Sequence, residues 1–195
     1  MTKVLIAYAS RHGSTRGIAE RLTTILSAEG LTCRIAPVEA DPDPSLVDAC
    51  ILGSGVYMGG WLKEGIDYAW RHSGMLAERP VWLFSSGPLP TAATQKGTDP
   101  NDPLAAALGP ADGPGSGGRK KIAELSAAIH PRDHRVFFGA YDPKDPPKSM
   151  PERLVRMLPH AGDILPAGDF RDWPVIESWA HELARELHGT LVAVG

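Results

Sequence analysis

The sequence contains little cysteine. Cys33 and Cys50 are the two cysteines among 195 residues, and they lie in the apolar stretches "LTCRIA" and "VDACILG". Neither has a second Cys or a His at the spacing that a zinc site or a CxxC redox motif requires. Because free cysteines are commonly buried, we expect two buried, reduced thiols.

Long apolar runs are also missing. The stretch "MTKVLIAY" at the start is too short for the apolar region of a signal peptide, and no window approaches the roughly 20 apolar residues of a membrane span. The cytoplasm is therefore the expected location, and any membrane contact is expected to be peripheral at most.

An excess of charge of one sign is absent too. The formal net charge is -3, and no basic stripe or block gives a reason to expect nucleic acid as a partner. Hydrophobic residues make up 43% and charged residues 22%, which is typical of a globular chain. The length favours one domain over residues 1–195, with insertions.

Five short apolar runs recur along the chain. They occupy residues 3–8, 33–38, 49–54, 80–85 and 135–140. Because they lack polar alternation, they predict strands that are buried on both faces of a sheet.

Helical patterns lie between and after these runs. The first helix has apolar residues at helical spacing and a stop at its end: Ile18, Leu22, Ile25, Leu26 and then Gly30. The last helix has an N-cap, a proline in its first turn and a glycine beyond its end, which are Asp172, Pro174 and Gly189.

Two further helices are predicted over residues 61–72 and 119–129. The apolar stripe of the former is expected to consist of Leu62, Ile66, Ala69 and Trp70. Strands that alternate with helices predict an α/β fold, a doubly wound five-stranded parallel sheet with helices on both faces. Ligands bind such sheets at the carboxyl ends of the strands, so the loops after the first, third and fourth strands are candidates for a site.

Two long insertions interrupt this alternation, at about residues 88–118 and 141–172. The first is rich in Pro and Gly, and it is either a functional lid or a disordered insertion. The second contains a short apolar patch at Leu154, Val155, Met157 and Leu158. It is either a small helix over the binding face or a packed excursion.

The loop "SRHGST" after the first strand has the composition of an anion site. A helix start offers unpaired N–H groups and a positive dipole end. Ser10, Ser14 and Thr15 can add hydroxyl donors, and Gly13 permits an unusual backbone path. No Lys follows as in a Walker loop, and GxGxxG is missing, so a mononucleotide or phosphate ester remains. The alternative is an ordinary N-cap formed by Ser14 or Thr15.

Two more glycine-rich loops, "GSGVYMGGW" and "SSGPLP", leave the third and fourth strands. Their glycines permit the backbone to approach a flat ligand closely: Gly53, Gly55, Gly59, Gly60 and Gly87. Tyr57, Met58 and Trp61 can cover its face. A phosphate cradle beside such loops suggests flavin mononucleotide (FMN). Core packing is the alternative for Tyr57 and Trp61, and it is the favoured interpretation for Trp82.

These residues resemble the flavodoxin-like FMN-binding family, in which the first loop reads T/S-x-T-G-x-T. The matching positions here are Ser10, Arg11, His12, Gly13, Ser14 and Thr15. Within that family the chain looks closest to the branch of menaquinone-dependent protoporphyrinogen dehydrogenase, through "SRHGSTRGIAE", "ILGSGVYMGGWLKE", the segment after "VFFGA" and "DWPVIESWAHELA". One position departs from the pattern, because His12 stands where many flavodoxins have Thr.

The resemblance implies noncovalent FMN, with its phosphate held by residues 10–15. A protonated His12 could assist the phosphate. The resemblance also implies that the flavin ring is held by two stretches, Gly53, Ser54, Gly55, Val56, Tyr57 and Met58, and Ser85, Ser86, Gly87 and Pro88.

Flavin chemistry requires no separate catalytic residues and no metal. The cluster "HPRDH" offers His130, Asp133 and His134 as metal ligands, which is a disfavoured interpretation. Tyr141 and its neighbours Asp142 and Lys144 lie on the site side of the sheet, where they could meet a partner, although a solvated turn is favoured.

Three functions follow. The chain is an FMN-dependent oxidoreductase acting on a small apolar substrate such as a quinone or porphyrinogen, a one-electron carrier between redox partner proteins, or a scaffold or regulatory module without redox chemistry. The added segment after the fifth strand favours the first function, because a small carrier needs no such cover.

Overall fold

The computed structural model describes residues 1–57, 59–87, 116–148, 150–158 and 167–192. Most of the predicted insertion at 88–118 lies outside these residues, so neither interpretation of it is tested. Met58 and Pro88, two predicted site residues, also lie outside them.

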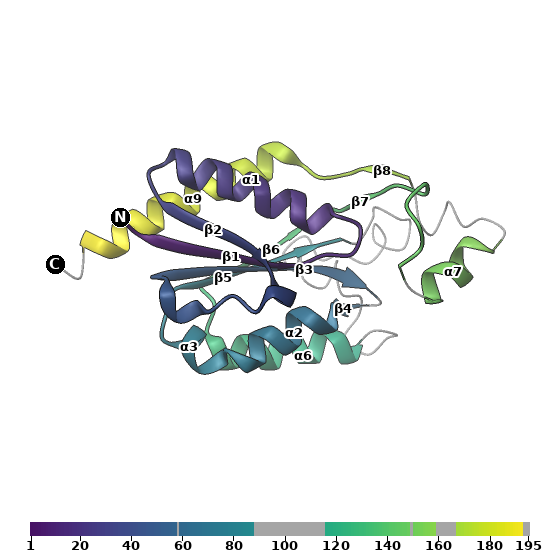
Figure 1. The fold of residues 1–195 in the computed structure, drawn as a ribbon, viewed down its shortest axis with the longest axis horizontal. Coiled ribbons are helices and arrows are strands. Elements are labelled where there is room, and N and C mark those ends of the chain that lie inside the picture. Colours follow the sequence, from purple (N-terminus) through teal and green to yellow (C-terminus); the bar gives the residue numbers. More distant parts are fainter. Residues whose placement is uncertain (58, 88–115, 149, 159–166, 193–195) are drawn as a thin grey trace.

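A parallel sheet forms the centre of the molecule (Figure 1). Its strands are β1 (Lys3–Ala9), β2 (Thr32–Pro37), β3 (Ala49–Tyr57), β5 (Val81–Ser86) and β6 (Asp133–Phe137), in the order β2-β1-β3-β5-β6. The short β4 (Gly60–Trp61) pairs antiparallel with the end of β3. The predicted doubly wound five-stranded α/β fold is therefore confirmed.

Helices cover both faces of the sheet (Figure 1). One face packs against α1 (Ser14–Ala28) and α9 (Trp173–Val192), and the other against α2 (Lys63–Arg71), α3 (Ser73–Ala77) and α6 (Ser116–Ile129). Two 3-10 turns, Val38–Ala40 and Pro44–Leu46, lie between β2 and β3. None of the helices in the described ranges is long and apolar enough to cross a membrane.

Three elements lie beyond the carboxyl ends of the strands (Figure 1). They are β7 (Ala140–Tyr141), α7 (Met150–Arg156) and β8 (Gly168–Asp169), and β7 pairs antiparallel with β8. The second predicted insertion thus contains the small helix that the sequence suggested.

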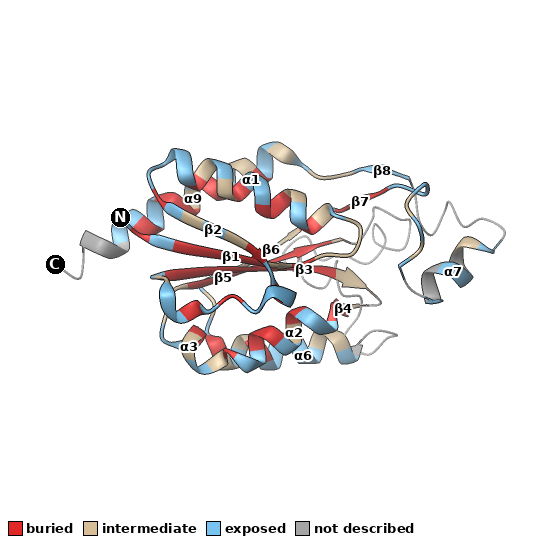
Figure 2. Ribbon diagram, in the orientation of Figure 1, coloured by how far each residue is buried: buried red, intermediate tan, exposed pale blue. Residues whose placement is uncertain are grey.

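Burial differs between the inner and outer strands (Figure 2). The inner strands β1, β3 and β5 are buried almost throughout, as expected for strands covered on both faces. The prediction of two-sided burial is wrong for β2 and β6, which form the sheet edges and whose residues are mostly exposed or half-buried. Cys33 on β2 is consequently only half-buried, whereas Cys50 on β3 is buried and its burial raises the pKa of the thiol to about 12. Both cysteines are free, as expected.

Several helix boundaries differ from the prediction, and α6 begins at Ser116 instead of residue 119. Trp61 belongs to β4, so the helix begins two residues later at Lys63. Its buried face contains Tyr68 and Ala69, while Trp70 is 42% exposed, because Trp70 lies one position beyond the apolar stripe. The stop expected at Gly189 is also wrong, because α9 continues to Val192 through this exposed glycine.

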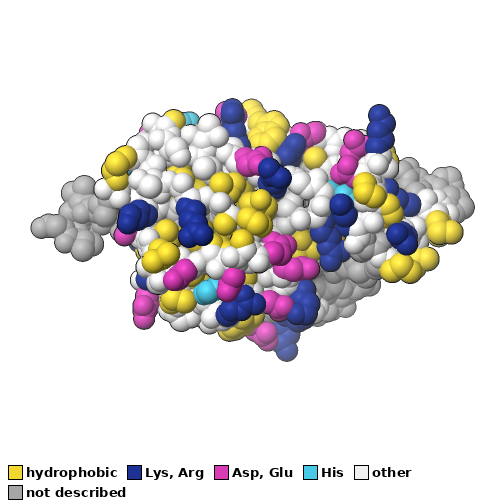
Figure 3. Space-filling view, in the orientation of Figure 1, with side chains coloured by type: hydrophobic (Ala, Val, Ile, Leu, Met, Phe, Trp, Pro, Cys, Tyr) yellow, Lys and Arg dark blue, Asp and Glu magenta, His cyan; other side chains and the backbone are white. Residues whose placement is uncertain are grey.

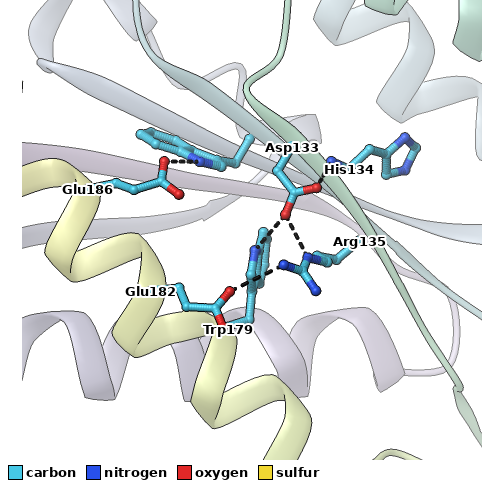
Figure 4. A network of polar contacts seen from close by, with 7 residues as sticks. Asp133, His134, Arg135, Trp179, Glu182 and Glu186 are labelled. Atoms are coloured by element: carbon cyan, nitrogen blue, oxygen red, sulfur yellow. Dashed lines mark hydrogen bonds and ion pairs between the residues drawn. The ribbon is translucent and has the colours of Figure 1, made fainter.

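The edge strand β6 is joined to α9 by a polar network (Figure 4). Asp133 accepts hydrogen bonds from the Trp179 indole at 3.2 Å and from Arg135 at 2.6 Å, and Arg135 also donates to Glu182. The N-cap of α9 is Asp172 as predicted, since its Oδ1 accepts a hydrogen bond from the Val175 amide at 3.2 Å.

On the face seen in Figure 3, Lys and Arg side chains are interspersed with Asp and Glu.

Candidate functional site

The loop between β1 and α1 leaves the helix start without a side-chain cap. Gly13 is the N-cap residue, with φ +81°, and as a glycine it has no side chain that could cap the first turn. The left-handed backbone at this position favours glycine. A Cβ there would meet no atom within 4 Å, so the space around Gly13 is open. The alternative of an ordinary cap formed by Ser14 or Thr15 is wrong. The uncapped amides offer an anion a binding place.

Ser10 adds an unsatisfied hydroxyl to this loop. Its Oγ is buried and has no hydrogen-bond partner within the described part of the chain. A buried polar atom without a partner costs free energy, and such atoms are rare unless they serve a ligand or water. The loop therefore has the donors, the dipole and the open backbone that a phosphate would use.

Ser14 connects the loop to two other elements. Its Oγ shares a hydrogen bond with the Ser86 Oγ at the end of β5, at 3.0 Å. The same oxygen accepts a hydrogen bond from the Ala140 amide at 3.0 Å. The first loop, the end of β5 and the segment after β6 therefore meet at one hydroxyl.

The loop after β3 lies beside the first loop. The guanidinium carbon of Arg11 lies 5.1 Å from the centroid of the Tyr57 ring, which is a cation–π distance. A Cβ at Gly55 would lie 3.4 Å from the Thr15 hydroxyl, so this glycine stands where the two loops approach each other. The predicted phosphate and ring loops are thus adjacent.

Two of the predicted glycines have another physical reason. A Cβ at Gly53 would overlap the Phe84 ring, and a Cβ at Gly60 would lie 2.8 Å from the Gly118 Cα. Both glycines are therefore required by packing within the protein. Gly87 has φ +94°, and its amide donates to the Phe137 carbonyl at 2.9 Å, so this glycine turns the chain at the end of β5.

Two predicted site serines are engaged inside the protein. The buried Ser54 Oγ accepts a hydrogen bond from the Leu62 amide at 3.1 Å and donates to the Gly55 carbonyl at 3.0 Å. The buried Ser85 Oγ accepts from the Trp61 indole at 2.8 Å and bonds the His134 Nε2 at 2.9 Å. Any contribution of these two residues to a ring site would come from their backbone.

The triad Trp61, Ser85 and His134 lies within the core near the site. Trp61 is 8% exposed and stands edge-on to the His134 ring at 5.8 Å, so packing describes it better than stacking on a ligand. Burial lowers the pKa of His134 to about 4, with a smaller opposing effect from Asp133. The imidazole is therefore neutral near neutral pH. The sequence did not predict this triad, whose members lie on three different strands.

The side chains of Asp133 and His134, two of the candidate metal ligands near β6, point in different directions. Asp133 points to Trp179 and Arg135, whereas His134 points away from them (Figure 4). No group of three or more His, Cys, Asp or Glu side chains suited to a metal is found in the part of the chain that the structure describes.

The segment after β6 contacts the first loop. Tyr141 is 8% exposed, so the favoured interpretation as a solvated turn is wrong for this residue, although Asp142 and Lys144 are exposed as expected. His12 stands edge-on to the Tyr141 ring with the centroids 6.0 Å apart, and its Nδ1 lies 3.6 Å from the Asp145 Oδ2. No local pattern in the sequence indicates these contacts.

Apolar side chains of the second insertion remain exposed. Leu154, Met157 and Leu158 are 62%, 81% and 51% exposed. The interpretation of this patch as a packed excursion is therefore wrong for these three residues, while the Val155 side chain is outside the description. The patch stands on and just after α7, beyond the carboxyl end of the sheet (Figure 1).

A known family matches most of the chain. Residues 5–144 match the family described as flavodoxin domain, which is more than half of the chain. A search of curated proteins gives no match.

Solved structures share the fold. Rubredoxin:oxygen oxidoreductase from Desulfovibrio gigas is 19% identical with a TM-score of 0.55, and the alignment covers 98% of this chain and 37% of that chain. A cysteine-to-serine mutant of flavodoxin from Pseudomonas aeruginosa is 15% identical with a TM-score of 0.53, covering 95% and 99%. The flavodoxin from Streptococcus pneumonia TIGR4 is 17% identical with a TM-score of 0.52, covering 94% and 99%. The chain thus spans little more than a third of the Desulfovibrio protein.

Proposed function

The chain belongs to the flavodoxin domain family, and on this basis we propose that it is an FMN-dependent oxidoreductase that exchanges electrons with a small apolar substrate of the quinone or porphyrinogen type. FMN is the cofactor that this membership implies. The observation that carries the proposal is the uncapped start of α1 beside the buried, unsatisfied hydroxyl of Ser10.

The first loop fits a phosphate group. Ser10 and Thr15 would offer hydroxyls, and the backbone amides after Gly13 would offer donors in the field of the helix dipole. Ser14 would act mainly as a link, since its oxygen already accepts from the Ala140 amide.

The loops after β3 and β5 would hold the flavin ring. Their backbones at 53–57 and 85–87 would lie along it, with Tyr57 against one face. Arg11 lies over the Tyr57 ring and would bring a positive charge to that side. Bound FMN supplies reversible uptake of electrons and protons, while the residues around it tune its potential through hydrogen bonds and charge.

A small apolar substrate is supported by the exposed apolar patch at Leu154, Met157 and Leu158. This patch stands at the same end of the molecule as the loops (Figure 1). It agrees with the likeness to the branch of menaquinone-dependent protoporphyrinogen dehydrogenase. We further propose that residues 1–195 form one domain with insertions.

The phosphate cradle is tested by two substitutions at one position. Gly13→Asp and Gly13→Asn have the same size, and both Asp and Asn tolerate positive φ. The carboxylate of Gly13→Asp would face the phosphate, and such like-charge contacts cost several kcal/mol, so we expect FMN affinity to fall at least about 100-fold relative to Gly13→Asn.

Titration of flavin fluorescence measures both affinities. Riboflavin, which has no phosphate, is the matched control ligand and should distinguish the two variants little. Equal FMN affinity in both variants, or a wild-type protein that takes up no FMN, would contradict the proposal.

The substrate class is tested with reduced, FMN-loaded protein. Stopped-flow absorbance follows its reoxidation by a short-chain quinone and by a one-electron protein acceptor. Faster reoxidation by the quinone is expected. A strong preference for the protein acceptor would instead assign the chain as an electron carrier.

A further inference from the structure

His12 faces the segment that follows β6. This post-β6 segment consists of residues 140–148 and 150–156. The His12 side chain is only 5% exposed, its Nδ1 lies 3.6 Å from the Asp145 carboxylate, and its ring meets the Tyr141 ring edge-on at an interplanar angle of 79°. Both neighbours belong to the post-β6 segment, so this segment contacts the buried His12 side chain.

Arg156 holds the post-β6 segment together. Its guanidinium carbon lies 5.2 Å from the centroid of Tyr141, and its Nη1 donates to the carbonyls of Pro143 at 3.1 Å and Asp145 at 2.7 Å. The end of α7 is therefore tied to the two residues that contact His12. Movement at Tyr141 or Asp145 would carry α7 with it.

The phosphate loop makes a second connection to the same segment. The Ser14 hydroxyl accepts a hydrogen bond from the Ala140 amide, at the first residue of β7. Two residues of the loop 10–15 thus contact the post-β6 segment. The family match ends at residue 144, so Asp145 and α7 lie outside the range that the family shares.

We propose that His12 anchors the post-β6 segment to the phosphate loop instead of contacting the phosphate, and that the anchored segment slows the release of the flavin. The claim about release rests on the proposed function, whereas the claim about anchoring does not. An edge-on aromatic pair and a histidine–carboxylate contact at 3.6 Å to a 47% exposed Asp side chain are each weak. Together they hold a local segment in place without deciding whether the chain folds.

Three variants separate the contacts. His12→Ala removes both the ring contact and the contact with the carboxylate, whereas Asp145→Asn removes only the negative charge of the carboxylate. Asp142→Asn is the matched control, because Asp142 lies in the same segment and its Oδ1 accepts from the Lys144 amide, which an Asn oxygen can also do.

Hydrogen exchange of the flavin-free protein tests the anchoring. We expect amides of the post-β6 segment to exchange roughly fivefold faster in His12→Ala, less so in Asp145→Asn, and at the wild-type rate in Asp142→Asn. Exchange in β1 and β3 should stay unchanged, which excludes global unfolding as the cause. Unchanged exchange of the segment in both His12→Ala and Asp145→Asn would overturn the proposal.

Flavin release tests the second claim. Dissociation of FMN and of riboflavin should accelerate by the same factor in His12→Ala, so that the ratio of their affinities stays as in the wild type. A selective loss of FMN affinity would identify His12 as a phosphate ligand and overturn the proposal. A protein that binds neither flavin would refute the proposed function and the claim about release, while the exchange measurement would still decide the anchoring.

Discussion

The inner strands change character where they reach the carboxyl end of the sheet. Along most of their length β1, β3 and β5 carry large apolar side chains that are fully buried. Toward this end β3 contains Gly53, Ser54 and Gly55, and β5 ends with Ser85 and Ser86. The side chains of Ser54, Ser85 and Ser86 are buried there. The apolar part gains stability from burial, whereas the polar end depends on hydrogen bonds between loops and leaves one hydroxyl, at Ser10, without a partner in the described residues.

Stability and binding are thus divided along the same strands. Substitutions in the apolar part should lower the stability of the protein with or without flavin. Substitutions in the loops should alter binding far more than stability. The triad at His134 lies at the border and should respond to pH.

The largest effect is expected from Phe84→Ala in the apolar part. Phe84 is fully buried, lies under Gly53 and packs against Phe137 and Trp179. Removing a buried Phe ring costs about 3–5 kcal/mol of unfolding free energy, measured by urea denaturation. Phe138→Ala is the control, because Phe138 is 46% exposed, and it should cost less than about 1 kcal/mol. Equal losses of unfolding free energy in Phe84→Ala and Phe138→Ala would contradict this prediction.

An intermediate effect is expected from pH at His134. Burial lowers the pKa of this histidine from 6.5 to about 4. Between these two pH values the unfolded chain binds a proton at this imidazole, whereas the folded protein does not. The stability that neutral His134 contributes is complete above pH 6.5 and decreases as the pH falls to about 4, by about 3 kcal/mol in total.

Denaturation midpoints between pH 4 and 7 measure this slope. In His134→Gln the slope should be reduced, because no buried imidazole remains to be protonated. His181→Gln serves as the control, since His181 is exposed on α9. An unchanged slope in His134→Gln would mean that other groups cause the acid sensitivity.

The smallest effect on stability is expected from Ser10→Ala. Its hydroxyl has no partner in the described residues, so the unfolding free energy of the flavin-free protein should change by less than about 0.5 kcal/mol. FMN affinity should fall about 10-fold or more, as expected for one lost hydrogen bond to a charged group. Thr24→Ala, on the exposed side of α1, should change neither quantity. Loss of stability without loss of affinity would assign Ser10 to the core.

Much of the fold followed from local pattern. The five strands, the N-cap at Asp172 and the first helix were predicted because apolar period and capping residues are short-range signals. The edge strands were misjudged, since the position of a strand within a sheet depends on strand order. Gly189 was misjudged because an exposed glycine is tolerated inside a long helix.

The site was predictable only in part. The loop 10–15 has a recognisable composition, and its uncapped helix start agrees with the anion interpretation. The contacts of His12 with Tyr141 and Asp145, and of Ser85 with His134, join residues distant in sequence and leave no local pattern. Gly53 and Gly60 were predicted to let the backbone approach a ligand. In the structure they are glycines because a Cβ would collide with Phe84 and with Gly118, respectively.

Gly60 and Gly118 constrain how this chain can evolve. A side chain at Gly60 would collide with the Gly118 backbone, and one at Gly118 would lie 2.6 Å from the Gly59 carbonyl. Neither position can therefore acquire a side chain unless β4 and the first turn of α6 separate. Among descendants of this sequence the two glycines should be kept together or lost together, and their loss should coincide with a change in the length or the starting point of α6.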